Sequence, residues 1–392
     1  MKRGFKIGLA SALATLVLGG CTSMEEKEIA QVEKTESAAE PVKVDKKATK
    51  AAEKVAKVEK KAPKPQIKIP PARYDSYIEY PDAQALMLDM QKEGFSEAYL
   101  FDVLSKAKRQ ESILKAMSRP AEKSLNWGQY RKIFIESKRI TQGVAFWKEN
   151  KVALERAEKE YGVPAEIIVS IIGVETRYGR ITGSYRVLDA LATLGFDYPR
   201  RGKFFQGQLK EYLRLVQEEK VEITSLKGSY AGAMGYGQFI PSSYRSFAID
   251  FDNDGKRDIW NNKTDAIGSV ANYFAEHKWK PGAPVISGVA FNGQTEEEWF
   301  SKGRKGLIPK VTLGEWQQRG VQPRMSNLAE DGKAILMRLE IGDDKQYWLG
   351  LHNFYVITRY NHSKLYAMAV YRLSEQIKAA YEKETMKMAE RS

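Results

Sequence analysis

The sequence predicts an α+β fold that is mainly α. Apolar residues recur at three- and four-residue spacing through most of residues 82–160, which is the period of amphipathic helices. β-Branched and aromatic residues, punctuated by glycine and aspartate, concentrate between about 283 and 350. A helical pattern then returns in SKLYAMAVYRLSEQIKAAYEK. Because helices and strands are segregated along the chain, an α+β arrangement is favoured over alternating α/β.

Residues 1–20 have the pattern of a targeting segment. MKRGFK is positively charged, and IGLASALATLVLGG is apolar but short for a spanning helix. LGGC resembles the lipobox of bacterial lipoproteins and ends in Cys21, the only cysteine of the chain. We predict a lipoprotein signal peptide over 1–20 and a lipid anchor on Cys21. Thr22 stands where inner-membrane lipoproteins usually have Asp, which favours the periplasmic face of the outer membrane. An ordinary cleaved signal with a spare thiol is the alternative.

Residues 21–72 are predicted to be a disordered tether. They are rich in Lys, Glu and Ala and contain no aromatic residue, so they have little to bury. The whole chain has 63 Lys and Arg against 50 Asp and Glu, a formal charge of +13. No zinc-finger, leucine-zipper or RNA-binding motif accompanies this charge. We therefore predict no nucleic-acid partner and attribute the charge to solubility or to anionic envelope polymers.

Cysteine and histidine usage excludes further classes of site. A single cysteine cannot form an intramolecular disulfide or a Cys-rich metal site. His277, His352 and His362 lie in separate contexts, and no His-Glu-x-x-His pattern is present. A zinc hydrolase and a Cys/His nucleophile pair are therefore not expected.

The folded part is predicted to begin near Tyr74 and to comprise four regions. Residues 73–160 form a helical domain, and residues 161–282 form the core, where Pro164 suits the first turn of a helix. Further core helices are predicted over 203–220 and from Asp265. Residues 283–350 form a small β-rich insert, with strand patterns in APVISGVAFNG, LIPKVTLGEW and KAILMRLEIGDDKQYWLGLHNFYVITRYN. Residues 351–392 return to the core.

The stretch IIGVETRYGR places a carboxylate, Glu175, at the end of an apolar helix. Apolar residues on all sides indicate that this helix is buried. Desolvation and the negative end of the helix dipole both favour the protonated carboxyl group. A carboxylic acid that stays protonated near neutral pH can protonate a leaving group. The alternative is an ion pair between Glu175 and Arg177 or Arg180.

The stretch GSYAGAMGYGQFIPSSY combines glycines with uncharged polar and aromatic side chains. Gly232, Gly235 and Gly237 allow a close backbone approach or positive φ. Gln238 and the tyrosines can hydrogen-bond a sugar, whereas no Gly-Lys-Ser/Thr loop for phosphate is present. A glycine-rich structural turn is the alternative.

The stretch DFDNDGKRDIWN matches the start of a calcium loop. Asp250, Asp252 and Asp254 occupy positions 1, 3 and 5, and the Lys256 carbonyl would serve position 7. Position 12 is Asn261 rather than a bidentate Glu. Asp258 is an alternative ligand, and a metal-free turn is the alternative to a calcium site.

Five motifs in order are similar to the membrane-bound lytic murein transglycosylase B family: GVETRYGR, FDYPRR, GSYAGAMGYGQFIPSSY, DAIGSVANYF and RYNHSKLYAMAVY. The resemblance runs from about Tyr74 to Tyr381. It implies a lysozyme-like core that cleaves peptidoglycan strands between N-acetylmuramic acid and N-acetylglucosamine. The product would carry a 1,6-anhydromuramic end, with Glu175 as both acid and base. The resemblance implies no cofactor for catalysis. It does imply a structural Ca²⁺ site in which Asp265 is the last acidic ligand of the loop.

The resemblance also implies a set of substrate-binding residues: Tyr130, Arg200, Arg201, Ser229, Gln238, Phe239, Tyr273, Tyr360, Asn361 and Tyr366. The two arginines would meet carboxylates of the muramic acid substituent. A hydrolytic muramidase with a second acid and a non-catalytic, calcium-stabilised wall-binding protein are the alternative functions. Cell-wall synthesis proteins are conceivable partners that the sequence does not identify.

Overall fold

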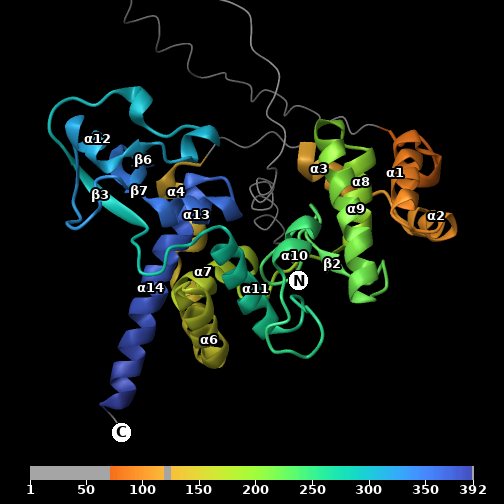
Figure 1. Ribbon diagram of the computed structural model, residues 1–392, viewed down its shortest axis with the longest axis horizontal. Coiled ribbons are helices and arrows are strands. Elements are labelled where there is room, and N and C mark those ends of the chain that lie inside the picture. Colours follow the sequence, from red (N-terminus) through yellow and green to blue (C-terminus); the bar gives the residue numbers. More distant parts are fainter. Residues whose placement is uncertain (1–70, 119–124, 391–392) are drawn as a thin grey trace, which may run out of the picture. The chain divides into compact units, whose positions relative to one another are not determined.

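The computed structural model describes residues 71–118 and 125–390 (Figure 1). The predicted signal peptide, Cys21 and all of the predicted tether except residues 71 and 72 lie outside this range. Among the described residues, no helix combines the length and the apolar character that crossing a membrane requires.

Short helices open the described chain. They are the 3₁₀ helix Tyr77–Glu79 and the α-helices α1 (Pro81–Lys92), α2 (Glu97–Lys106) and α3 (Glu111–Ser118). Pro81 occupies the first turn of α1, and the Ser96 hydroxyl accepts a hydrogen bond from the Tyr99 N–H at the start of α2. α1 packs against α2 and α9, and α3 packs against α8.

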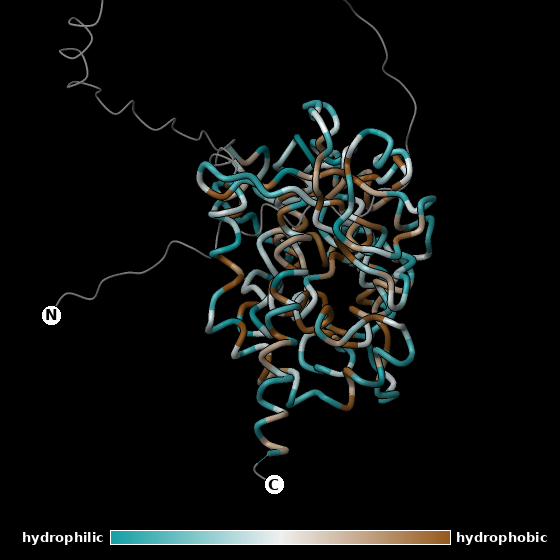
Figure 2. The backbone as a smooth tube through the Cα atoms, turned by 90° about the vertical axis from the view of Figure 1, so that its left-hand side faces the viewer, coloured by the Kyte–Doolittle hydropathy of each residue, from teal (hydrophilic) through white to brown (hydrophobic). Residues whose placement is uncertain are grey.

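The central helices follow: α4 (Trp127–Phe134), α5 (Ser137–Glu149), α6 (Lys151–Tyr161), α7 (Ala165–Thr176), α8 (Val187–Phe196), α9 (Gly202–Glu219), α10 (Pro241–Phe247) and α11 (Lys263–Glu276). α7 lies at their centre and contacts α5, α6, α11 and the C-terminal helix α14 (Lys364–Ala389). Ile168, Val169, Ile171 and Ile172 of α7 are fully buried. The prediction that this helix is apolar on all sides and buried is confirmed. Figure 2 shows hydrophobic residues gathered toward the interior, whereas hydrophilic residues are frequent in the peripheral loops.

A five-stranded antiparallel sheet forms the predicted β-rich region. Its strands are β3 (Ile286–Phe291), β4 (Val311–Thr312), β5 (Val321–Pro323), β6 (Lys333–Ile341) and β7 (Asp344–Gly350), in the order β4-β6-β7-β3-β5. β6 and β7 form a hairpin in which Ile335 faces Gly350 and Ile341 faces Asp344. The sheet has a small hydrophobic cluster that is separate from the main core and includes Val289, Phe300, Leu336 and Leu349. A further two-stranded sheet joins β1 (Tyr185–Arg186) to β2 (Lys227–Gly228).

Two strand predictions are wrong in part. In LIPKVTLGEW only Val311 and Thr312 are a strand, because Thr312 and Glu315 form a capping box that starts the helix α12 (Leu313–Gln318). The segment HNFYVITRY is the helix α13 (His352–Tyr360) despite its β-branched and aromatic residues. Burial of Phe354, Val356 and Ile357 in the core overrides the local β propensity.

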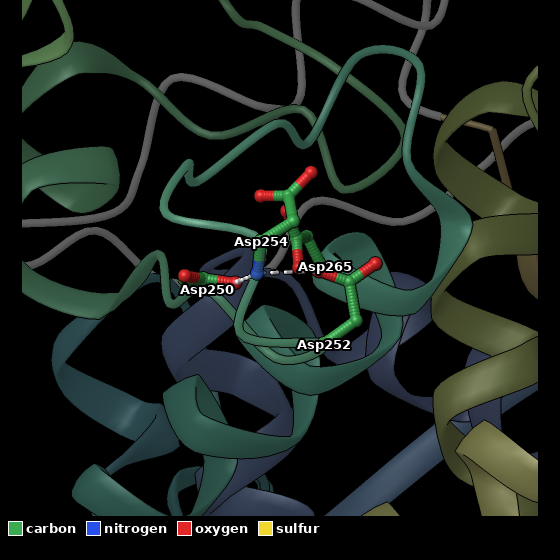
Figure 3. A group of neighbouring side chains, drawn as sticks. All are labelled: Asp250, Asp252, Asp254 and Asp265. Atoms are coloured by element: carbon green, nitrogen blue, oxygen red, sulfur yellow. Dashed lines mark hydrogen bonds between the residues drawn. The ribbon is translucent and has the colours of Figure 1, made fainter.

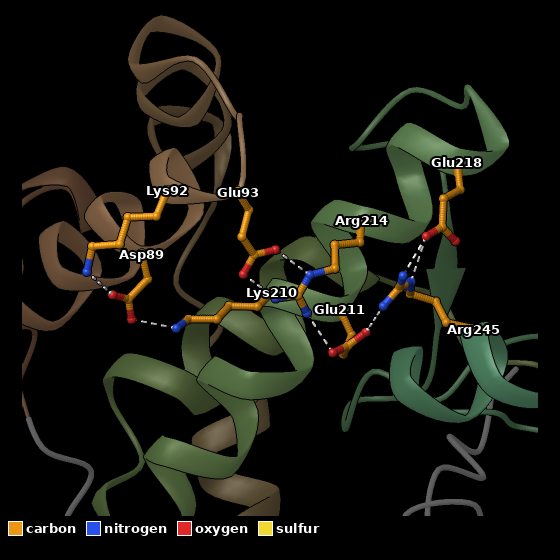
Figure 4. A network of polar contacts seen from close by, with 8 residues as sticks. All are labelled: Asp89, Lys92, Glu93, Lys210, Glu211, Arg214, Glu218 and Arg245. Carbon is orange, nitrogen blue, oxygen red and sulfur yellow. Dashed lines mark hydrogen bonds and ion pairs between the residues drawn. The ribbon is translucent and has the colours of Figure 1, made fainter.

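An ion-pair network joins the N-terminal helices to α9 (Figure 4). Asp89 of α1 lies 2.7 Å from Lys210, and Glu93 lies 2.6 Å from Arg214. Arg214 also pairs with Glu211, which in turn pairs with Arg245 of α10. Most of these side chains are partly exposed, so each pair contributes only about 0–1 kcal/mol. The network therefore connects α1, α9 and α10 without adding much to the stability of the fold.

Candidate active site

The helix α7 ends in a left-handed turn just after Glu175. Arg177 and Tyr178 follow the helix with φ of 52° and 61°, and their N–H groups donate to the carbonyls of Gly173 and Ile172. This left-handed ending stops the helix at Thr176, three residues before Gly179. Glu175 is therefore in the last turn of the helix, as predicted.

Glu175 is half-buried and has a tyrosine as its hydrogen-bond partner. The Tyr366 hydroxyl donates to Glu175 Oε1 at 2.5 Å. Burial raises the pKa of Glu175 to about 7, although the Tyr366 hydrogen bond opposes this by favouring the carboxylate. Arg177 does not pair with Glu175, because it pairs with Glu136 at 2.6 Å. The alternative of an ion pair between Glu175 and Arg177 is therefore wrong.

Three tyrosines surround this carboxyl group. The charge of Glu175 contributes, after burial, to raising the pKa values of Tyr130, Tyr360 and Tyr366, so all three phenols are close to it and remain neutral. Tyr130 lies on α4, Tyr360 ends α13, and Tyr366 lies in the first turn of α14. Among the described residues, no second carboxylate contributes to the pKa of Glu175.

Gln238 is held by the backbone around it. It is buried, has φ of 53°, and its Nε2 donates to the carbonyls of Thr182 at 3.1 Å and Gly235 at 3.0 Å. Both amide hydrogens are thus used, and Oε1 remains as an acceptor. The neighbouring Gly237 is required by close packing, because a Cβ there would lie 2.8 Å from Tyr360 Oη.

An aromatic wall connects this loop to the C-terminal helices. The Phe239 ring lies 5.8 Å from Tyr273 and 6.0 Å from Tyr360. The Tyr360 hydroxyl donates to the Gly237 carbonyl at 2.5 Å, and the Tyr273 hydroxyl donates to the Arg359 carbonyl at 2.7 Å. Asn361, beside Tyr360, is buried, and its Nδ2 has no acceptor among the described residues.

Ser229, Arg200 and Arg201 form no hydrogen bond or ion pair with Glu175 within the described part of the chain. The Ser229 hydroxyl accepts from the N–H groups of Ala231 and Ala233 and so shapes its own loop. Arg200 is exposed, and the Arg201 guanidinium lies 4.2 Å from the centre of the Phe204 ring. The structure thus brings Tyr130, Tyr360 and Tyr366 together with Glu175.

Sequence reasoning missed Arg139, a buried arginine that supports the site. Its Nη1 donates to the Gly173 carbonyl of α7 at 2.7 Å, and its Nη2 donates to the Ile133 carbonyl of α4 at 3.3 Å. It therefore connects the helix that carries Glu175 to the helix that carries Tyr130. An arginine within an amphipathic helix pattern is normally expected at the surface, so no signal in the sequence predicts that Arg139 is buried.

The four acidic residues of the predicted calcium loop converge (Figure 3). Asp250, Asp252, Asp254 and Asp265 each offer a carboxylate oxygen, and these oxygens all lie within 4.8 Å of one another. Asp265 is buried at the start of α11 and accepts from the N–H groups of Phe251 and Asp258.

The remaining residues of this loop have other positions. The Lys256 N–H donates to Asp254 Oδ1 at 2.9 Å, which keeps Lys256 in the turn. Asp258 instead accepts from the N–H groups of Trp260 and Asn261 and is not in the converging group. Clustered carboxylate oxygens on a tight loop fit a hard cation such as Ca²⁺.

A family model described as transglycosylase SLT domain matches residues 79–375. The chain belongs to this family. It is 45% identical over 310 residues to membrane-bound lytic murein transglycosylase B of Escherichia coli (strain K12), which covers 76% of this chain and 83% of that protein.

Two solved structures agree with the family. The Escherichia coli lytic transglycosylase Slt35 in complex with calcium is 44% identical with a TM-score of 0.70, covering 78% of this chain and 95% of that one. SltB3 of Pseudomonas aeruginosa in complex with NAG-NAM-pentapeptide is 31% identical with a TM-score of 0.68, covering 78% and 80%. The predicted lysozyme-like α+β fold and the predicted enzyme class, a lytic transglycosylase, are confirmed.

Proposed function

We propose that this SLT-domain transglycosylase cleaves the β-1,4 bond between N-acetylmuramic acid and N-acetylglucosamine in peptidoglycan and leaves a 1,6-anhydromuramic end. Glu175 is the single acid and base of the reaction. The observation that carries this proposal is a half-buried Glu175 with a pKa of about 7, surrounded by neutral phenols. The relative named a lytic murein transglycosylase supports the substrate class.

The first step is protonation of the leaving group. Near neutral pH a large fraction of Glu175 is protonated, so its carboxyl proton can pass to the glycosidic oxygen. The bond between that oxygen and C1 of the muramic acid then breaks, and positive charge develops on C1. Tyr366 stabilises the glutamate carboxylate that forms, because its hydroxyl already donates to Oε1.

The second step closes the anhydro ring. The Glu175 carboxylate removes the proton from the O6 hydroxyl of the same muramic acid, and O6 attacks C1. Glu175 ends the cycle protonated, as it began, so no water is consumed. An intramolecular nucleophile has a high effective concentration. A hydrolytic glycosidase instead uses two carboxyl groups on either side of the bond, and among the described residues no second one contributes to the pKa of Glu175.

The remaining residues of the site bind and orient the glycan. Gln238 offers its amide oxygen to a sugar hydroxyl or acetamide N–H, and Asn361 offers its unpaired Nδ2. Phe239 and Tyr273 supply the aromatic wall. Tyr130, Ser229, Arg200 and Arg201 complete the proposed set of substrate-binding residues.

Asp250, Asp252, Asp254 and Asp265, with the Lys256 carbonyl, would hold a structural Ca²⁺. The ion would offset the repulsion between these carboxylates and fix the loop that leads into α11, which carries Tyr273. The calcium complex of the relative Slt35 supports this choice of cation.

The predicted location is the periplasmic face of the outer membrane, with the chain anchored through lipid on Cys21. The relative named as membrane-bound supports a place in the cell envelope. This anchor would keep the enzyme close to the peptidoglycan that it cleaves.

The proposal is tested by Glu175→Gln on purified glycan strands. A glutamine has no proton to give or take, so we expect turnover to fall by at least about a thousandfold while strand binding remains. Glu166→Gln is the matched control, because Glu166 lies on the same helix but pairs with Lys378 at 2.9 Å. If the Glu175 variant digests strands at the wild-type rate, the mechanism is wrong and a non-catalytic wall-binding role gains support.

A further inference from the structure

Lys364 is a half-buried lysine whose ammonium group binds backbone carbonyls instead of a carboxylate. Its Nζ donates to the carbonyls of Ser301 at 3.2 Å and Arg338 at 3.3 Å. Within residues 71–118 and 125–390 it forms no ion pair. An ammonium group that leaves water loses hydration, so the two carbonyl acceptors must compensate for that loss. The contact is therefore a specific attachment and not a freely solvated surface charge.

Both carbonyls belong to the sheet of the β-rich insert. Arg338 lies within β6, which pairs with β7 along most of its length. Ser301 lies beside the same strand, because its N–H donates to the Leu336 carbonyl at 2.8 Å. Lys364 therefore binds a part of the insert that the hydrogen bonds of the sheet hold in place.

The same lysine opens the helix that carries Tyr366. The Ser363 hydroxyl accepts from the Tyr366 N–H at 3.3 Å and caps α14, so Lys364 and Tyr366 both lie in the first turn. This turn is fixed at its cap and at its first side chain. The Tyr366 phenol donates to Glu175 Oε1 at 2.5 Å. Lys364 is thus two residues from the one side chain that donates to the Glu175 carboxyl group within the described residues.

The insert also contacts the helix that carries Tyr130. A Cβ at Gly128 of α4 would lie 3.1 Å from Ile341 Cα at the end of β6, so a glycine allows this close approach. α4 packs against both β6 and α14. Tyr130 follows two residues after Gly128. The strand β6 therefore adjoins the helices that bring two of the three phenols to Glu175.

The Glu175 carboxyl group has few neighbours that can alter its pKa. The phenols of Tyr130, Tyr360 and Tyr366 come from α4, α13 and α14 and stay neutral. From α5, Arg139 binds backbone carbonyls, and no charged group of α6 or α11 contributes to the pKa of Glu175 in the described part of the chain. The hydrogen bond from Tyr366 opposes the effect of burial. A change in the geometry of this one bond is therefore expected to move the pKa of Glu175.

We propose that Lys364 is a positioning residue that holds Tyr366 at hydrogen-bonding distance from Glu175 by attaching the start of α14 to the β-rich insert. The importance of this contact for catalysis rests on the proposed function. Without the attachment the first turn of α14 can shift, and the hydrogen bond to Glu175 weakens. The pKa of Glu175 then rises, because a donor favours the charged form of a carboxyl group. The β-rich insert thereby influences proton transfer through α14.

The test measures the pKa of Glu175 by NMR on the full chain. Glutamate is labelled with ¹³C at its side-chain carboxyl group, and the signal of Glu175 is the one that is missing from Glu175→Gln. Lys364→Met removes the ammonium group and keeps most of the apolar stem, whereas Lys364→Arg keeps a cation that can donate to two carbonyls. If Lys364→Met folds poorly, Lys364→Gln provides the same comparison with a polar side chain one atom shorter.

Lys378→Met is the matched control. It removes another ammonium group from α14, one that pairs with Glu166 at 2.9 Å. We expect Lys364→Met to raise the pKa of Glu175 by about 0.5 and to lower kcat about fivefold. Lys364→Arg and Lys378→Met should change this pKa by less than about 0.2.

A double-mutant cycle with Tyr366→Phe shows whether Lys364 acts through Tyr366. In the Tyr366→Phe background, Lys364→Met should not raise the pKa of Glu175 further, because the hydrogen bond that it supports is already gone. A rise of the same size in both backgrounds would mean that the ammonium group acts by its charge, and would overturn the proposal. An unchanged pKa in Lys364→Met would also overturn it and leave Lys364 a purely structural contact. Failure of the proposed function would appear separately, in the products of the wild-type enzyme.

Discussion

At the scale of single residues, the central feature is one carboxyl group whose proton is controlled by its surroundings. Burial favours the protonated form of Glu175, and the Tyr366 hydroxyl partly restores the carboxylate. The two influences together give a pKa of about 7, which suits a group that must donate and then accept a proton. The position of this carboxylate at the end of an apolar helix was visible in the sequence. Its partner was not, because Tyr366 is 191 residues away along the chain.

The pH dependence of the reaction follows from these contacts. In the proposed mechanism the reactive form of Glu175 is the acid, so kcat/KM should fall as the pH rises through about 7. Tyr366→Phe removes the hydrogen bond that favours the carboxylate, so the pKa of Glu175 should rise and the falling limb should move to higher pH. We also expect kcat to drop about tenfold, because the forming carboxylate loses its donor. Steady-state rates on glycan strands between pH 5 and 9 provide the measurement, with Tyr371→Phe of the same helix as control.

A falling limb that stays where it is in the Tyr366 variant would mean that another group controls this part of the profile. Tyr371 is a suitable control because its neighbours are Glu375 and Arg372, not Glu175. Loss of a tyrosine hydroxyl from α14 is therefore separated from loss of this particular hydrogen bond.

At the scale of elements, the site depends on how helices end and how loops are fastened. Two left-handed non-glycine residues follow the end of α7, and Arg139 donates to the buried Gly173 carbonyl next to that ending. Helix existence was predicted well, because a 3.6-residue period is a strong signal. The residue at which α7 ends and the existence of the helix α13 were not predicted, because both depend on tertiary contacts. Burial of Phe354 and Ile357 decides α13 against its local preference.

The acidic loop before α11 is the element that we expect to respond to Ca²⁺. Removal of Ca²⁺ with a chelator should lower Tm by several degrees, because four converging carboxylates would then repel one another. Adding Ca²⁺ back should restore Tm, whereas the same concentration of Mg²⁺ should restore it less, since Mg²⁺ demands stricter geometry. Differential scanning fluorimetry measures both.

Asp252→Asn should make Tm independent of Ca²⁺ at low concentrations, whereas Asp258→Asn should not, because Asp258 caps a turn outside the converging group. If Ca²⁺ leaves the Tm of the wild-type protein unchanged, the loop is a metal-free turn.

At the scale of the whole molecule, distant segments meet around one carboxyl group. α4 contributes Tyr130, α7 contributes Glu175, and the segment at the junction of α13 and α14 contributes Tyr360 and Tyr366. The β-rich insert interrupts the chain between α11 and α13, and Lys364 fastens it beside the site. The sequence shows the order of the motifs along the chain. It does not show that the motif with Glu175 and the motif with Tyr366 meet in space, because that depends on the packing of α7 against α14.

The proposed chemistry makes a whole-molecule prediction about water. A transglycosylase with one carboxyl group closes the sugar on itself, whereas a muramidase with two adds water to it. The most direct measurement is digestion of glycan strands by the full chain in ¹⁸O-labelled water, followed by mass spectrometry of the new chain ends. The account predicts 1,6-anhydro ends that are lighter by one water than the hydrolytic product and contain no ¹⁸O. Reducing ends that carry ¹⁸O would contradict it.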